Sequence, residues 1–254
     1  MTILITGHKG FIGSHLTKKL GSLGLKWIGY DLVDGNDIRN KLSLERVFDS
    51  YPIEVVIHLA SLTGARRGEE YPQEYFDTNV IGTENVARLC EKYGVKKLIA
   101  FSSASAKTCM NTYGITKHAM ELMLERCKVK SIHVVRPFNV YGENGRPDQV
   151  IWKWKNRIEA GLPIEYHGNL KRNYTYVGDL IEALLQLLSI DGDATWDFGS
   201  DQKIGLENLL NLFIEKYPGL RINKKEMEDV EVSPEKNYLS FNTDFITKVK
   251  ELLK

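Results

Sequence analysis

Three glycines, at positions 7, 10 and 13, constrain the fold of this chain more than any other feature of its sequence. A short apolar run, residues 3–5, precedes them, and apolar residues at helical spacing follow them. A strand, a glycine turn and a helix in this order form the setting of a dinucleotide-binding loop. Glycine lets backbone turn sharply and approach a pyrophosphate, which the N-terminus of the helix attracts. We therefore expect a dinucleotide to bind at Gly7, Gly10, Phe11, Ile12 and Gly13.

The spacing of these glycines is G-x-x-G-x-x-G, which departs from the G-x-G-x-x-G dinucleotide fingerprint. The alternative is an ordinary glycine-rich turn that binds nothing. Asp31 favours the first interpretation, because it ends a second apolar run, residues 27–30. A carboxylate about twenty residues past the glycines suits a hydrogen bond to a ribose hydroxyl and repels a 2′-phosphate. We expect NAD rather than NADP, although aspartate is also a common turn residue.

Composition argues against several classes of protein. A net charge of +1 without a basic stripe argues against a nucleic-acid partner. No apolar run approaches the length of a membrane span, and a first strand at residue 2 leaves no room for a signal peptide. The three cysteines are an odd number without close spacing, which favours reduced thiols in the cytoplasm. The six histidines are scattered, so we expect no metal site.

Apolar runs alternate with helical patterns along most of the chain, and its end, residues 224–254, is highly charged. A polar stretch, residues 63–73, precedes a long helix whose core is expected to include Phe76, and a further helix is expected over residues 206–216. One buried strand, residues 54–60, ends in small side chains, and another, residues 97–101, ends at Ser102 and Ser103. Small residues at the carboxyl end of a parallel strand leave room for a ligand. The alternation predicts an α/β protein with a doubly wound parallel sheet.

A second informative cluster lies on the helix after Ser103. Tyr113 and Lys117 are four residues apart, so they share one face of that helix. A lysine ammonium beside a tyrosine favours the phenolate and lowers the pKa of the tyrosine toward neutrality. Ser103 can hydrogen-bond the reacting hydroxyl. Ser103, Tyr113 and Lys117 are therefore candidate catalytic residues, whereas a Y-x-x-x-K pair alone is more often a solvated helix face.

The order of these motifs resembles the extended short-chain dehydrogenase/reductase family, the NAD-dependent nucleotide-sugar epimerases and dehydratases. That family uses G-x-x-G-x-x-G, which accounts for the departure noted above. The resemblance covers nearly the whole chain and includes residues 37–38, 58–61, 79–83, 102–103, 113–117, 136–142 and 172–179.

The resemblance implies roles for individual residues. It implies further cofactor contacts from Asp37, Ile38, Leu59, Ala60, Ser61, Asn79, Ser102, Tyr113, Lys117 and Pro137. It implies substrate contacts from Thr63, Ser103, Asn139 and Arg172, of which Arg172 holds a substrate phosphate.

The resemblance also implies an arrangement of domains. A Rossmann-type NAD-binding domain is expected over residues 1–140 and 175–198. A smaller C-terminal α/β substrate-binding domain is expected over residues 141–174 and 199–254. The helices around Asn79 and Tyr113 are expected to form a homodimer, and Met120 and Met123 belong either to that interface or to the core.

Three departures from the family pattern bear on function. Ala104-Ser105-Ala106 follows Ser103 where the dehydratases place acidic residues, so we do not expect elimination. The segment between Ser103 and Tyr113 is short, which predicts a more open substrate crevice. Arg221 lies too early to serve as a second phosphate-binding arginine. Arg172, helped by Lys171, is then the main cationic anchor, and a substrate without a nucleotide stays open.

The main functional hypothesis is an NAD-dependent epimerase that inverts a hydroxyl of a nucleotide sugar, usually at C4, through a transient keto intermediate. The alternative is an NAD(P)-dependent reductase or dehydrogenase of a keto-sugar or other small alcohol, which needs the same three residues. A third interpretation, a cofactor-binding regulator without chemistry, conflicts with the presence of all three. Cys109 is expected to be a structural thiol.

Overall fold

The computed structural model describes residues 1–168, 170–225, 233–234, 241 and 243–254. The chain divides into two compact units. Unit 1 consists of Met1–Pro137 and Ile181–Asp197, and unit 2 consists of Phe138–Leu180 and Phe198–Lys254. The sequence prediction placed the corresponding breaks after residues 140, 174 and 198.

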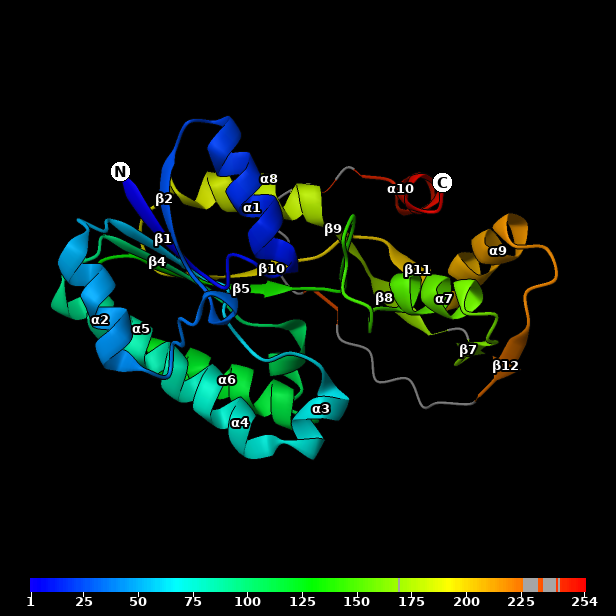
Figure 1. The fold of residues 1–254 in the computed structure, drawn as a ribbon, viewed down its shortest axis with the longest axis horizontal. Coiled ribbons are helices and arrows are strands. Elements are labelled where there is room, and N and C mark those ends of the chain that lie inside the picture. Colours follow the sequence, from blue (N-terminus) through cyan, green and yellow to red (C-terminus); the bar gives the residue numbers. More distant parts are fainter. Residues whose placement is uncertain (169, 226–232, 235–240, 242) are drawn as a thin grey trace. The chain divides into compact units, whose positions relative to one another are not determined.

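A six-stranded sheet forms the centre of unit 1 (Figure 1). Its spatial order is β10-β5-β4-β3-β1-β2, and the pairs β1–β2, β1–β3, β3–β4 and β4–β5 are parallel. The strands are β1 (Thr2–Thr6), β2 (Lys26–Tyr30), β3 (Val55–His58), β4 (Lys97–Phe101), β5 (Ile132–Pro137) and β10 (Ala194–Phe198). From β1 the sheet grows toward β2 on one side and β3 on the other, which makes the β1–β3 edge the switch point of the topology.

Helices cover both faces of this sheet (Figure 1). One face carries α1 (Phe11–Ser22) and α8 (Val177–Leu187), and the other carries α2 (Lys41–Ser50), α5 (Thr83–Lys92) and α6 (Thr112–Leu124). Buried apolar residues of α2, α5 and α6 form one core with those of the strands, among them Leu44, Val86 and Met120. The predicted α/β class and doubly wound sheet are confirmed. Met120 belongs to this core, and Met123 packs against it.

The long helix predicted after the polar stretch at residues 63–73 is present, but it is not regular. It consists of α4 (Pro72–Phe76), a π-helical turn, Asp77–Gly82, and α5, which adjoin without a break. The polar stretch itself contains a short helix, α3 (Ala65–Glu70). Proline can begin α4 but cannot continue α3. The wider turn shifts the buried face, so Phe76, which we expected in the core, is 40% exposed.

Unit 2 contains helices and short paired strands. The helices are α7 (Val150–Glu159), α9 (Leu206–Lys216) and α10 (Phe245–Leu252). The strand pairs are β6 (Val140–Tyr141) with β9 (Thr175–Tyr176), β8 (Lys171–Asn173) with β11 (Lys203–Gly205), and β7 (Ile164–Tyr166) with β12 (Ile222–Lys224). Trp154 of α7 meets Phe213 of α9 edge to face in its core. Part of the charged end predicted from residue 224 lies outside the described residues.

Candidate active site

The glycine loop lies at the switch point of the sheet. Gly7 has a φ of +73°, and a Cβ there would come within 2.6 Å of the backbone nitrogen of Ala60, which follows β3. A Cβ on Gly13 would lie 2.2 Å from the carbonyl oxygen of Gly7. Backbone atoms cannot move aside as a flexible side chain can, so only glycine fits at both positions.

The first turn of α1 points its N–H groups toward this loop. Gly10 is the N-cap residue, and within the described residues no side chain caps the turn. Phe11 and Ile12 belong to that turn and are half-buried. A tight backbone cradle with uncapped N–H groups fits a pyrophosphate, because the helix dipole and the N–H groups both attract anions. Unit 1 can therefore hold the cofactor phosphates here.

Asp31 lies at the carboxyl end of β2, beside the same loop. Its Oδ2 accepts the backbone N–H of Lys9 at 2.9 Å, and its Oδ1 accepts the N–H of Val33 at 3.0 Å. Each carboxylate oxygen keeps a second lone pair, so ribose hydroxyls can still donate to it. The aspartate thus holds the glycine loop and fits the adenosine ribose of NAD.

Asp37 and Ile38, both expected to contact the cofactor, differ in their surroundings. The guanidinium of Arg39 donates to both oxygens of Asp37 and lowers the pKa of that carboxyl. Ile38 is 4% exposed and packs closely against Gly82. A Cβ added to Gly82 would lie 2.6 Å from Cδ1 of Ile38. Ile38 is therefore part of the hydrophobic core of unit 1.

His58, the last residue of β3, is enclosed by two threonines. One ring nitrogen, Nδ1, lies 2.6 Å from Oγ1 of Thr6, and Nε2 lies 3.0 Å from Oγ1 of Thr83. Complete burial lowers the pKa of His58 to about 3, and the positive charge of Lys117 adds to this. A neutral imidazole thus fixes the end of β3, from which Leu59, Ala60 and Ser61 emerge half-buried.

Asn79 and Thr63 lie on the segment that follows β3. The amide of Asn79 accepts the N–H of Leu62 at 2.8 Å and donates to Leu62 O at 3.0 Å and to Thr116 Oγ1 at 3.1 Å. It is fully buried and joins the loop after β3 to α6. The carbonyl oxygen of Thr63 accepts the hydroxyl of Tyr75 at 2.6 Å. Asn79 therefore shapes the loop that carries Thr63.

The three candidate catalytic residues come from adjoining segments of unit 1. Ser103 lies two residues beyond the end of β4 and caps the turn η3 (Ala104–Lys107), where its Oγ accepts the N–H of Ser105 at 3.2 Å. A Cβ on Gly114 would lie 2.5 Å from the carbonyl oxygen of Ser105, so the turn after Ser103 packs directly against the start of α6. Tyr113 lies in that first turn, half-buried, with its ring edge-to-face on Tyr75.

Lys117 lies one turn further along α6 and is 2% exposed. Its Nζ donates to the carbonyl oxygen of Phe101 at 2.7 Å. Burial lowers the pKa of Lys117 to about 7, and the carboxylate of Glu121 opposes that shift. Ser102 is buried as well, and its hydroxyl donates to Glu121.

Pro137 is the last residue of β5, and the remaining predicted residues lie in unit 2. Asn139 has a φ of +35° and donates through Nδ2 to Asn173 O at 3.0 Å. Arg172 is half-buried in β8 and donates through Nη1 to the carbonyl oxygen of Lys171 at 2.7 Å. Near Tyr113, Cys109 has a φ of +51°, and its thiol donates to the carbonyl oxygen of Ala106 at 3.3 Å.

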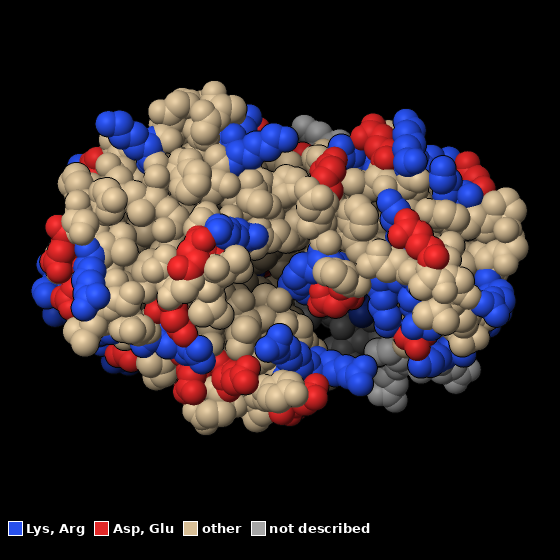
Figure 2. Space-filling view, viewed as in Figure 1, with Lys and Arg blue, Asp and Glu red and all other residues tan. Residues whose placement is uncertain are grey.

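Charges of both signs are intermixed over the face drawn in Figure 2. In the part of the chain that the structure describes, no group of three His, Cys, Asp or Glu side chains could hold a metal ion. None of the described helices is long and apolar enough to cross a membrane.

Four charged residues near the three candidate catalytic residues had no role in the sequence analysis: Lys107, Glu121, Arg136 and Asp197. Arg136 was noted only as the start of a motif, and Glu121 continues the Tyr113–Lys117 face at helical spacing, which is a signal in the sequence. Lys107 and Asp197 pair across 90 positions. No local pattern could have joined those two residues.

Comparison with known proteins connects this site to a family. Residues 3–196 match the model of the NAD dependent epimerase/dehydratase family. Over 235 residues the chain is 33% identical to Protein CapI of Staphylococcus aureus, covering 74% of this chain and 69% of that protein. It is 32% identical to the probable UDP-glucuronate 4-epimerase of Rhizobium meliloti, over 74% of this chain and 68% of that protein.

Solved structures share the fold. The UDP-glucose 4-epimerase of Thermotoga maritima, solved with UDP-glucose, superposes with a TM-score of 0.89 over 100% of this chain and 97% of that one, at 24% identity. MoeE5, in complex with UDP-glucuronic acid and NAD, has a TM-score of 0.85 over 98% of this chain and 96% of its own, at 25% identity.

Proposed function

The chain belongs to the NAD dependent epimerase/dehydratase family, and we propose that it inverts the C4 hydroxyl of a nucleotide sugar through a transient keto intermediate. The membership confirms the resemblance drawn from the motifs. NAD is the cofactor, and the glycine cradle with Asp31 fits it.

One observation carries this proposal. The turn after Ser103 packs against the helical turn that holds Tyr113, closely enough that Gly114 has no room for a Cβ. Lys117 is anchored to the end of β4 through Phe101 O, one residue before the Ser102–Ser103 pair. The segments that carry the serine, the tyrosine and the lysine are therefore packed together within unit 1, as proton transfer to and from a single hydroxyl requires.

Each residue then has a distinct task. Tyr113, as phenolate, takes the proton of the sugar hydroxyl and later returns it. The ammonium form of Lys117 favours that phenolate, and Ser103 donates a hydrogen bond to the oxygen that becomes a carbonyl. Bound NAD supplies the reversible acceptance of hydride at the sugar carbon.

The absence of acidic residues at positions 104–106 supports epimerisation over elimination. Arg172, in unit 2, is our proposed partner for a substrate phosphate. Because the R. meliloti relative is a probable UDP-glucuronate 4-epimerase, we propose a UDP-sugar, with UDP-glucuronate and UDP-glucose as the first to test.

The test is to incubate the purified protein with UDP-glucuronate, UDP-glucose, and GDP- and dTDP-sugars, to separate the products, and to follow reduced cofactor by absorbance. A C4 epimer without net NADH is the expected result. Net NADH, with an oxidised or reduced sugar, would overturn the proposal in favour of a dehydrogenase or reductase. Ser103→Ala should lower turnover, and Ser105→Ala, two residues away, is the matched control.

We also propose that the protein acts in the cytoplasm.

We propose, in addition, that two copies of the chain associate through α6 and the π-helical turn. Ile115 and Leu122 lie seven residues apart on α6, and their side chains are 43% and 50% exposed. Ile81, on the π-helical turn, is 48% exposed. Apolar residues seven apart lie on one face of a helix, and pairing of α6 between two copies would bury this exposed apolar strip.

A further inference from the structure

A buried carboxylate joins three segments that carry candidate site residues. Glu121, one turn beyond Lys117 on α6, is 6% exposed. It accepts the hydroxyl of Ser102 at the end of β4, and it accepts Nε and Nη2 of Arg136 near the end of β5, at 2.9 and 2.6 Å. These bonds tie together the neighbours of Ser103, of Lys117 and of Pro137.

A second buried carboxylate holds the other end of the turn that begins at Ser103. Asp197, on β10, is 4% exposed, and its Oδ2 lies 2.9 Å from Nζ of Lys107, the last residue of η3. Nη1 of Arg136 lies 3.9 Å from Oδ1 of the same aspartate. Arg136 therefore stands between the two carboxylates.

The four side chains form one chain of charge, Glu121–Arg136–Asp197–Lys107, with two positive and two negative members. The segment from Ser102 to Lys107 is fastened to this chain at both of its ends. Buried ion pairs of this kind often add little to stability in place of apolar residues, and fixing one conformation is a role they can serve instead. The segment that they fix here is the one that carries Ser103.

We propose that Glu121, Arg136, Asp197 and Lys107 are positioning residues, which hold Ser103 in place against Tyr113 by clamping the Ser102–Lys107 segment at both ends. The inference deepens the proposed function and rests on it for the role of Ser103. The clamp acts on the part of the Ser103–Tyr113 connection nearest Ser103, where the other hydrogen bonds are those of a single turn. The far end of the connection is held separately, by the N–H of Thr112, which donates to Glu69 Oε1 at 2.7 Å.

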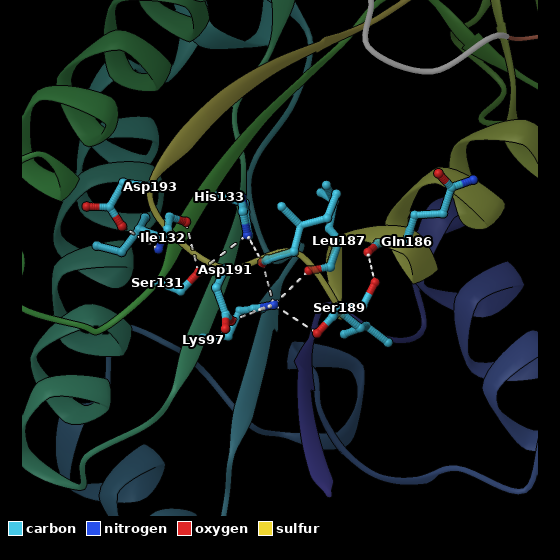
Figure 3. A network of polar contacts seen from close by, with 12 residues as sticks. Lys97, Ser131, Ile132, His133, Gln186, Leu187, Ser189, Asp191 and Asp193 are labelled. Carbon is cyan, nitrogen blue, oxygen red and sulfur yellow. Dashed lines mark hydrogen bonds and ion pairs between the residues drawn. The ribbon is translucent and has the colours of Figure 1, made fainter.

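The variant Lys107→Met removes the distal end of the clamp and keeps a side chain of similar length. The matched control is Lys97→Met. Lys97 is a buried lysine of unit 1, but it lies at the opposite end of β4 and donates to Leu187 O, Leu188 O and Ile190 O (Figure 3). Both variants lose the ammonium of a side chain that is no more than 9% exposed, and only Lys107→Met loses the clamp.

Two readouts are compared: hydrogen exchange of backbone amides 105–109 without substrate, and kcat with KM. In Lys107→Met we expect exchange of these amides to accelerate about tenfold or more relative to Lys97→Met. We expect kcat to fall about tenfold or more, since a misplacement of about an ångström can cost about a hundredfold. KM for the sugar and the affinity for NAD should stay within about twofold. Lys107→Arg should restore both readouts, because it keeps the charge.

Equal exchange and equal kcat in the two methionine variants would overturn the proposal. So would a loss of kcat in Lys97→Met as large as in Lys107→Met, which would mean that general destabilisation is the cause. Should Lys107→Met not fold, Asp197→Asn, which keeps the shape of the side chain, is judged by the same two readouts. If the wild-type protein converts no sugar, the proposed function fails, and the exchange comparison alone decides whether the clamp exists.

Discussion

The Nζ of Lys117 donates to the carbonyl oxygen of Phe101 at 2.7 Å, in a part of α6 that water does not reach. Burial disfavours the charged form of an amine, and this lowers the pKa of Lys117 to about 7. Near neutral pH, therefore, the lysine that would support the Tyr113 phenolate is divided between its charged and neutral forms.

The depressed pKa of Lys117 predicts a pH dependence of stability. Between about pH 7 and 10.5 the folded chain has released this proton and the unfolded chain has kept it. The unfolded chain binds more protons in that window, so the free energy of unfolding should rise with pH, by at most about 1.4 kcal/mol per pH unit. Denaturant unfolding at several pH values should show this rise in the wild-type protein and not in Lys117→Met. Parallel curves would contradict the prediction.

His58 predicts a second dependence, on the acidic side. The unfolded chain takes up a proton at a pKa near 6.5, whereas the folded chain resists protonation of His58 down to about pH 3. As the pH falls through this window, the unfolded chain binds more protons and the free energy of unfolding should decrease. His58→Gln, which can still bond to Thr6 and Thr83, should lose less stability between pH 6.5 and 4 than the wild type. An equal or greater loss in the variant would show that His58 is not the cause.

Substitutions of glycine in α1 should separate the cradle from the helix. In Gly13→Ala the new methyl group meets Gly7 O and the backbone of His8. We expect a loss of NAD affinity of about tenfold or more, since about 1.4 kcal/mol of strain suffices for that. Gly21→Ala is the control, because nothing lies within 4 Å of its Cβ, and it should stabilise by up to about 1 kcal/mol. Calorimetric titration with NAD and thermal unfolding measure the two effects; unchanged affinity in Gly13→Ala would refute the cradle.

Tyr113→Phe removes the proposed base and leaves the ring. Turnover should fall by about a hundredfold or more, the usual contribution of acid–base catalysis, and NAD should bind within about twofold of the wild-type affinity. Tyr71→Phe, at an exposed tyrosine of the same unit, should retain full activity. Retained activity in Tyr113→Phe would remove Tyr113 from the mechanism.

The proposed dimer depends on the exposed strip of α6. Leu122→Glu places a charge at one end of that strip and should convert a dimer into a monomer, as measured by sedimentation equilibrium. Leu42→Glu is the control, because Leu42 is also exposed but lies on α2. A wild-type protein that is monomeric at micromolar concentration would rule out the dimer.

Much of the fold could be predicted from local patterns. Residues 97–101 form a strand and residues 206–216 form a helix with the bounds that the sequence indicated, because both are marked by uninterrupted apolar periodicity. The π-helical turn at Asp77–Gly82 could not be predicted, since one extra residue per turn leaves almost no trace in such a pattern. Phe76 was misplaced for that reason.

The candidate site likewise contains features that the sequence predicted and features that it could not predict. Gly7, Gly13 and Asp31 lie close to one another because the carboxyl ends of β1, β2 and β3 meet at one edge of the sheet. The alternation of elements predicted that these strands are parallel, although it did not give their order. The burial of Lys117, the enclosure of His58 and the pairing of Lys107 with Asp197 depend on which side chains meet across tens of residues. Those contacts belong to packing and have no local sequence signature.

The contact between Asp31 and the backbone of Lys9 has a consequence for cofactor engineering. A designer who replaces Asp31 with a neutral residue, to admit the 2′-phosphate of NADP, also unfastens the glycine loop that must hold the pyrophosphate. A switch of cofactor preference in this chain therefore needs a second change that re-anchors the loop. The same constraint applies to natural evolution toward NADP. A chain with only position 31 changed would bind both cofactors poorly, because its glycine loop is no longer held by Asp31.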